Sequence, residues 1–267
     1  MNHRNLRNVS TASFVALTTL ACQAFAGPTQ KPQASPVAPP VSKVVTAPST
    51  AEKSTTGTAA AIDTKPAPSP APLPPVSATK FCPTEGMVGK NGNLMHVDVG
   101  AMRGFLSTDR SRTAEVEFTY RGASKDTQPL LSGEIRRQIG LKLKAQDTCN
   151  VVYAMWHVAP TPGLSVAVKS NPGKNTYAAC KDQGYINATP SMTKDVPPIV
   201  AGVPHTMRAE LDGQKLKVIV DGTLVWAGSL PPEAAVIDGP PGVRSDNGTF
   251  DFQVRVPSGA AAAPPCK

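Results

Sequence analysis

The sequence predicts an all-β domain, either a sandwich or a barrel, and two observations in its C-terminal third support this. Residues 205–211 and 215–220 alternate between apolar and polar side chains, and successive side chains of a strand point to opposite faces. Asp212-Gly213 and Asp221-Gly222 follow these runs, and Asp-Gly favours hairpin turns because both central residues must reach positive φ. Short antiparallel strands separated by such turns are typical of sandwiches and barrels.

The first 26 residues are predicted to be a secretory signal peptide. They combine a basic start with a short apolar stretch, residues 12–22, and end in Ala24-Phe25-Ala26, a small-x-small cleavage pattern. An uncleaved anchor is disfavoured because this stretch is too short to span a bilayer comfortably. A lipid on Cys22 is a further alternative, but the leucine of the lipid-attachment box is displaced by one position. We expect cleavage before Gly27, no later membrane span, and a periplasmic or secreted protein.

Residues 27–80 have the composition of a disordered linker rich in Pro and Ala. They contain 12 of the 28 prolines and no Phe, Trp, Tyr or Met. Such a segment has too little apolar bulk to offset the entropy of ordering it, and its proline runs favour extended polyproline II. The remaining residues, 81–267, are long enough for one sizeable core and are expected to form a single domain.

The net charge of this domain argues against a nucleic-acid partner. The whole chain has a formal charge of +8, but residues 81–267 contain 20 basic and 17 acidic side chains, a net charge of only +3. A nucleic-acid-binding domain is normally far more basic and concentrates its charge on one face.

Alternation and turn residues predict strands along the whole domain. The expected strands are residues 94–99, 113–121, 134–144, 150–158, 164–169, 205–211, 215–220, 223–228 and 250–256. Residues 170–202 are rich in Asn, Pro and Gly and are expected to form a long loop, and Ser245-Asp246-Asn247-Gly248 is expected to be a turn. Residues 231–237 could make one helical turn.

Four cysteines remain after signal cleavage, Cys82, Cys149, Cys180 and Cys266. An even number in an exported chain favours disulfides, and the absence of a Cys-x-x-Cys pair or a His cluster argues against zinc. Four cysteines allow three pairings. Because the first and last strands of sandwiches are often neighbours, we favour Cys82–Cys266, which leaves Cys149–Cys180.

Residues 204–208, 220–226 and 239–247 together resemble the concanavalin A-like, laminin G-like superfamily. In that superfamily an Asp-Gly hairpin with Trp-x-Gly is followed by a G-x-x-G-x-R segment that leads into the last strand, and the match covers about fifty residues here. The resemblance implies a jelly-roll β-sandwich. It implies little about function, because the superfamily includes lectins, glycan hydrolases, polysaccharide lyases and adhesion modules.

The strand expected at residues 134–144 has a polar face that suits a glycan. Arginine can bind a carboxylate or sulfate with two parallel hydrogen bonds, and glutamine can both donate to and accept from sugar hydroxyls. The predicted ligand-binding residues are Arg136, Gln138, Lys142, His157 and Trp226. We expect a non-catalytic protein that binds a polysaccharide or another cell-envelope glycan, with a preference for anionic glycans if it has one.

An enzyme that acts on an acidic polysaccharide is the main alternative. Glu115 and Glu117 share one strand face, but the third acid found in jelly-roll glucanases is missing, so a solvated strand face is favoured. Residues 132–140 resemble motifs of the alginate lyase family, in which arginine and glutamine neutralise a uronate while histidine and tyrosine move protons. Gly140 stands where that motif has histidine, and Tyr153 and His157 could substitute.

Two further hypotheses are a structural envelope protein and a calcium site. A structural envelope protein without a small ligand would have the same pattern of strands. Asp246-Asn247 or Asp221 could join a calcium site, but calcium needs six or more oxygens and neither provides them. Asp and Asn are also ordinary turn residues, so no metal and no other cofactor is expected.

Overall fold

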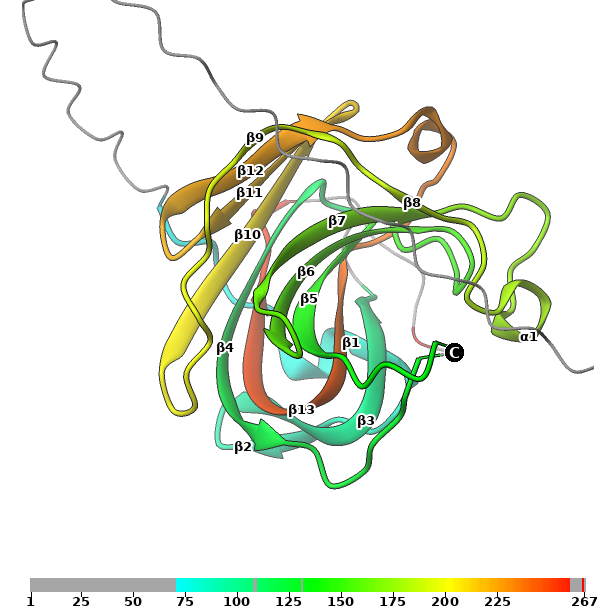
Figure 1. Cartoon of the computed structure of the whole chain (residues 1–267). Helices are drawn as coiled ribbons and strands as arrows, with labels where there is room; N and C mark the ends of the chain where they lie inside the picture. Colours follow the sequence, from blue (N-terminus) through cyan, green and yellow to red (C-terminus); the bar gives the residue numbers. More distant parts are fainter. Residues whose placement is uncertain (1–70, 108–109, 131, 260–265, 267) are drawn as a thin grey trace, which may run out of the picture. The chain divides into compact units, whose positions relative to one another are not determined.

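A computed structural model describes residues 71–107, 110–130, 132–259 and 266, which belong to one compact unit, Asp63–Lys267. Its strands are β1 (Phe81–Glu85), β2 (Gly89–Asn91), β3 (Leu94–Leu106), β4 (Thr113–Ala123), β5 (Arg137–Leu143), β6 (Val151–Ala159), β7 (Gly163–Lys169), β8 (Tyr185–Asn187), β9 (Pro190–Thr193), β10 (Pro204–Asp212), β11 (Lys215–Val220), β12 (Thr223–Ser229) and β13 (Gly242–Arg255) (Figure 1). Three short helical turns complete it, η1 (Ala78–Lys80), α1 (Tyr177–Cys180) and η2 (Pro232–Ala235).

The predicted signal peptide and most of the predicted linker lie outside the described residues. Within the described part, no helix is long and apolar enough to cross a membrane.

The long strand β13 joins the two arms of the sheet. Its first half, Gly242–Asp246, pairs with β5, its second half, Gly248–Arg255, pairs with β4, and β3 pairs along its other edge. Between the halves, Asn247 has a φ of 53°, so the strand bends there. One arm continues as β5-β6-β7-β8 and the other as β4-β10-β11-β12-β9, and Figure 1 shows the sheet curling back on itself.

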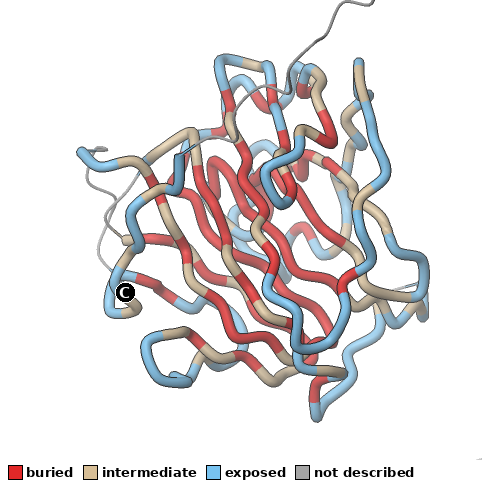
Figure 2. Tube along the Cα trace, turned by 90° about the vertical axis from the view of Figure 1, so that its left-hand side faces the viewer, coloured by how far each residue is buried: buried red, intermediate tan, exposed pale blue. Residues whose placement is uncertain are grey.

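Apolar side chains from both arms of the curled sheet pack against each other in the core. Phe118 of β4 and Trp156 of β6 come from different arms, and their rings pack edge to face with centroids 5.5 Å apart. Figure 2 shows buried residues concentrated along the strands and exposed residues concentrated in the connections. The all-β fold predicted from alternation is confirmed, and the curled antiparallel sheet is consistent with the β-sandwich that the resemblance implies. The hairpin predicted at Asp221-Gly222 is also confirmed, since these residues have φ of 47° and 79°.

Disulfides join Cys82 to Cys266 and Cys149 to Cys180, the pairing that the sequence favoured. The first ties β1 to the C-terminal end of the chain. The second ties the start of β6 to α1, which lies in the stretch expected to be a long loop. Such bonds persist in oxidising compartments, so they are compatible with an extracellular or periplasmic protein.

The structure differs from the sequence prediction in several places. Residues 170–202, expected to form a long loop, contain α1, β8 and β9. The turn expected at residues 245–248 lies inside β13, because Asn247 bends the strand without ending it. The strand expected at residues 134–144 begins only at Arg137. The folded part begins before the predicted boundary at Phe81, because the backbone of residues 74–76 hydrogen-bonds to the end of β13.

Candidate functional site

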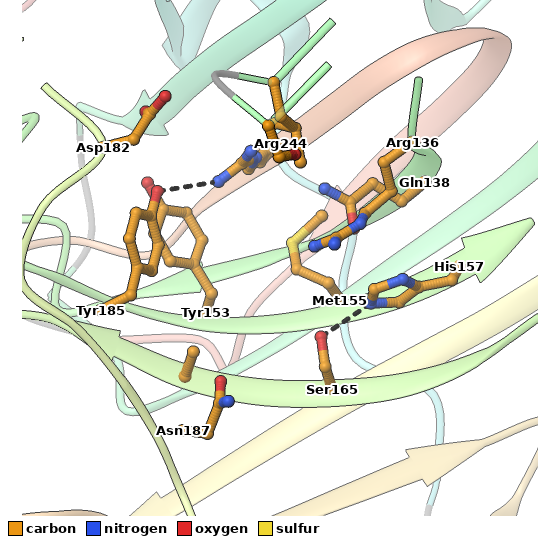
Figure 3. A pocket seen from close by; sticks show the side chains of 13 residues that line it. Arg136, Gln138, Tyr153, Met155, His157, Ser165, Asp182, Tyr185, Asn187 and Arg244 are labelled. Atoms are coloured by element: carbon orange, nitrogen blue, oxygen red, sulfur yellow. Dashed lines mark hydrogen bonds between the residues drawn. The ribbon is translucent and has the colours of Figure 1, made fainter. Parts of the chain in front are cut away.

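The face of β5–β8 that points away from the core forms a pocket of about 560 Å³ (Figure 3). Period-two alternation builds it: on β6, Tyr153, Met155 and His157 line the pocket while Trp156 and its alternating neighbours enter the core. The lining residues are Leu130, Ser132, Arg136, Gln138, Tyr153, Met155, His157, Ser165, Ala167, Asp182, Tyr185, Asn187 and Arg244.

A buried carboxylate, Asp246 of β13, holds two side chains that line the pocket, Arg244 and Gln138, in place. It accepts hydrogen bonds from Arg244 Nε at 2.8 Å and from Gln138 Nε2, and Arg103 Nη2 of β3 lies 2.7 Å away. Burial alone would raise the pKa of Asp246, but the Arg244 and Arg103 guanidiniums outweigh it and hold this pKa below its usual value. Asp246 is therefore fully engaged with cations, which leaves it unsuitable as a calcium ligand.

Two tyrosines and Arg244 form one wall. The Arg244 guanidinium lies 5.0 Å from the centroid of the Tyr153 ring, and its Nη1 donates to the Tyr185 hydroxyl at 3.3 Å. The two tyrosine rings stack with centroids 6.1 Å apart. Burial raises the pKa of Tyr153 to about 12, so its phenol stays protonated at neutral pH. Tyr185 is 41 % exposed, and its ring is therefore accessible to a ligand.

The opposite wall contains Arg136 and His157. Arg136 makes a two-pronged ion pair with Glu134, through Nε at 3.1 Å and Nη2 at 2.6 Å. The Asn247 side chain holds this segment in place by donating to the carbonyl of Arg136 at 2.9 Å. His157 Nε2 lies 2.7 Å from Ser165 Oγ. Burial, reinforced by Arg136, lowers the pKa of His157 to about 4, so its imidazole is neutral at pH 7.

The five predicted ligand-binding residues divide into three groups. Arg136, Gln138 and His157 line the pocket together. Lys142, two residues beyond Gly140 on the same face of β5, lines a smaller neighbouring cavity instead. The expectation that Trp226 contacts a ligand is wrong in this structure, because its side chain is 3 % exposed and packs in the core of the other arm.

Lys144, the last residue of the strand expected at residues 134–144, does not line the pocket. This side chain is buried, and its ammonium donates to the carbonyl of Ala234 at 2.6 Å. It therefore anchors η2 to the sheet and is unavailable to a ligand.

Sequence reasoning assigned no binding role to Arg244, Tyr185 and Asn187. Arg244 lies in the G-x-x-G-x-R segment, whose resemblance suggested a fold and no ligand contact. Tyr185 and Asn187 belong to the three-residue strand β8, in a region expected to be a loop. Only its pairing with β7 brings β8 to the pocket, and no local pattern encodes that pairing.

The described residues include no group of three or more His, Cys, Asp or Glu side chains that could hold a metal ion. Asp221, the other candidate for calcium, accepts from the backbone N–H of Thr206 at 2.7 Å and lies 2.8 Å from His205 Nδ1. It is thus a turn residue that stabilises the start of β10.

Comparison with known proteins finds similarity in fold only. No protein-family model and no curated protein sequence matches this chain.

Similar solved structures are carbohydrate-binding modules and glycan-acting enzymes. They include the carbohydrate-binding module CBM66 from Bacillus subtilis, which is 14 % identical with a TM-score of 0.47 over 68 % of this chain and 100 % of the module. They also include the Crh5 transglycosylase in complex with NAG, which is 14 % identical with a TM-score of 0.42 over 72 % of this chain and 86 % of that one. The catalytic domain of an endo-1,3-β-glucanase from Thermotoga petrophila RKU-1 is 12 % identical, with a TM-score of 0.38 over 64 % of this chain and 80 % of that one. Values this low carry no information about the activity of this chain.

Proposed function

We propose that this protein is an exported, non-catalytic glycan-binding module of the concanavalin A-like, laminin G-like superfamily. Its ligand is a polysaccharide or another cell-envelope glycan, bound in the pocket on β5–β8. The observation that supports this most is the wall formed by Tyr185, Tyr153 and Arg244. An accessible aromatic ring offers an apolar face to a sugar ring, while guanidinium and amide groups around it bind hydroxyls.

The polar groups of the pocket suit sugar recognition. Asn187 and Ser165 each provide both donors and acceptors, and Arg136 provides charged donors at the opposite wall. Because Asp246 and Glu134 already hold the arginines in place, these donors are pre-organised before a ligand arrives.

Hydrolysis is disfavoured by the shortage of acids. Among the described residues that line the pocket, Asp182 is the one carboxylate. Glycoside hydrolysis normally uses two carboxyl groups, one as the acid and one as the nucleophile or base. Glu115 and Glu117, the acid pair noted in the sequence, lie on β4 and are ion-paired with arginines there.

A polysaccharide lyase is the second candidate, because His157 shares the pocket with Arg136 and Gln138. Its imidazole is neutral at pH 7 and so could accept a proton from a sugar, while arginine neutralised the uronate. Incubation with alginate and pectate distinguishes the two candidates. A lyase releases unsaturated uronic ends, which absorb ultraviolet light, whereas a binding module leaves the absorbance unchanged.

A glycan array followed by calorimetry tests binding itself. Tyr185→Ala is expected to weaken the affinity for the bound glycan roughly tenfold, because it removes the stacking surface. Tyr185→Phe keeps the ring and is expected to retain most of the affinity. If no glycan binds, the reading as a structural envelope protein replaces this one.

Export is the remaining part of the proposal, and it rests on the tripartite pattern of residues 1–26. Intact-mass measurement on the native protein is expected to find a chain that begins at Gly27. A retained Met1 or a lipid on Cys22 contradicts simple cleavage.

A further inference from the structure

A second cavity of about 200 Å³ adjoins the glycan pocket. Tyr153, Tyr185 and Asp182 line both spaces, so the two tyrosines stand between them. Three cationic side chains, Lys142, Lys169 and Arg103, and two carboxylates, Glu85 and Asp182, line the second cavity.

Lys142 is the unusual member of this group. Its side chain is 5 % exposed, yet among the described residues its ammonium has no hydrogen-bond acceptor and no ion-pair partner. Burying an unpaired ammonium is costly, so this arrangement lowers the stability of the free protein. Lys169 differs, since its ammonium donates to the carbonyls of Thr148 and Lys181.

The charged groups around Lys142 do not compensate for it. Arg103 of β3 and Arg244 of β13 repel its ammonium. Glu85 of β1, which lines the same cavity, and Asp147 of the β5–β6 connection attract it, but neither forms an ion pair with it.

Each of these carboxylates has its own partners. Glu85 lies 3.7 Å from Arg103, and Asp147 accepts from the backbone N–H groups of Cys149 and Asn150. Asp182, across the cavity, accepts from the Tyr177 hydroxyl at 3.2 Å. Among the described cations that line the cavity, Arg103 has Glu85 and Lys169 has backbone carbonyls as partners, and Lys142 is the one without a partner.

We propose that this cavity is an anion subsite, in which Lys142 binds a carboxylate or sulfate group of the glycan whose neighbouring ring occupies the larger pocket. The inference rests on the proposed function and specifies its ligand class, an acidic oligosaccharide. Lysine is a point charge without the planar fork of arginine, so its ammonium can bind a carboxylate or a sulfate equally well.

Binding at this subsite is coupled to proton uptake. Burial, reinforced by Arg103 and Arg244, lowers the pKa of Lys142 to about 7 in the free protein. An anion beside Lys142 favours the ammonium and raises this pKa. Affinity is therefore constant well below pH 7 and falls as the pH rises through 7, by roughly tenfold per unit at most. With pKa values of about 4 and 12, His157 and Tyr153 do not titrate in this window.

Matched oligosaccharides test the subsite by calorimetry at pH 6. Pectate and alginate oligomers are compared with their methyl esters, and heparin-like oligomers with their desulfated forms. Wild-type protein is expected to prefer the acidic form roughly tenfold or more, and this preference should decline between pH 6.5 and 8.5. Lys142→Met should abolish the preference while keeping the affinity for the neutral form. Lys217→Met, which removes an exposed lysine of β11 in the other arm, should leave it unchanged.

The outcomes separate the subsite from the pocket. Equal binding of acidic and neutral forms, or a preference that survives Lys142→Met, overturns the subsite and leaves glycan binding intact. If no oligosaccharide binds, the proposed function is overturned, and the subsite is tested by NMR titration of the Lys142 side chain with inorganic sulfate. That titration uses the wild-type chain, so it also decides the matter if Lys142→Met fails to fold. A raised pKa supports the subsite, and an unchanged pKa refutes it.

Discussion

Two polar surfaces of this molecule carry similar residues but differ in whether all of their charged groups have partners. On β4, β10 and β13, Glu115 pairs with Arg208 through Nε at 2.8 Å, and Glu117 lies beside Arg255. Nη2 of Arg208 donates to the carbonyl of Ala71 at 2.5 Å, and its Nη1 lies 3.8 Å from Glu210. Every charge there has a partner, and an N-terminal segment of the chain lies over the surface.

The face of β5–β8 presents the contrast. Asp246 and its arginines are equally well paired, but the pocket beside them remains open, and Lys142 has no partner among the residues that the structure describes. Charge on a sheet face is therefore no sign of function by itself. A cavity that contains an uncompensated buried charge is a much stronger sign, because the protein loses stability by keeping it.

Removing a charge should destabilise the paired surface most. Glu115→Ala leaves Arg208 buried without its main carboxylate and is expected to lower the free energy of unfolding by about 3–5 kcal/mol. Glu117→Ala, in the more exposed pair with Arg255, should cost about 1 kcal/mol or less. Urea denaturation measures both. Equal and small effects would show that the Glu115 pair is solvated like an ordinary surface pair.

Removing a charge should instead stabilise the protein at the open surface. Lys142→Met removes a desolvated ammonium and is expected to raise the free energy of unfolding at pH 7, by up to about 4 kcal/mol at 1.36 kcal/mol per pKa unit. The folded pKa is depressed, so the unfolded chain binds more protons between about pH 7 and the ordinary lysine pKa of 10.5. The gain should therefore be full below pH 7 and shrink as the pH rises toward 10.5. A loss of stability at pH 7 in urea denaturation contradicts this.

The covering segment should contribute a smaller amount. A chain that begins at Ser77 lacks the carbonyls of Ala71 and Leu73 and the backbone pairing of residues 74–76 with β13. Compared with a chain that begins at Ala71, it is expected to lose about 2 kcal/mol, from several hydrogen bonds of about 0.5–1.5 kcal/mol each. Thermal unfolding of the two chains measures the difference, and glycan binding should be the same for both. Identical melting temperatures would mean that the segment covers the surface without stabilising it.

The smallest effect is expected at the wall of the pocket. Arg136→Ala should weaken binding of an acidic oligosaccharide by about 1 kcal/mol, because Glu134 already shares this guanidinium and part of the charge faces solvent. Raising the salt concentration should reduce the difference between variant and wild type. Arg255→Ala, on the covered surface, is the control and should leave affinity unchanged in calorimetry. Equal losses for both variants would indicate a long-range charge effect instead of a local contact.

The sequence by itself determined the class of fold and the strand faces on which several of the proposed site residues lie. Alternation with a period of two defines strands whatever their neighbours are, and Asp221-Gly222 defines a turn through backbone sterics alone. The same period placed Gln138 and Lys142 on one face of β5, while Arg136 and His157 were correctly expected near them. Cysteine parity and position also sufficed to favour the observed disulfides.

Only the tertiary structure decided which faces are covered and which residues meet. A period of two distinguishes two faces of a strand but does not say what packs on either, so Trp226 was expected at a surface and lies in the core. Arg244 and Tyr185 reach the pocket through strand pairings between distant segments, and Asn247 bends β13 where a turn was expected. That Lys142 lacks a partner within the described part of the chain is likewise a tertiary property, because it depends on which groups the nearby carboxylates contact. Alternation predicts the face of a strand on which a side chain lies. Pairing between distant strands decides which of those side chains meet in the pocket.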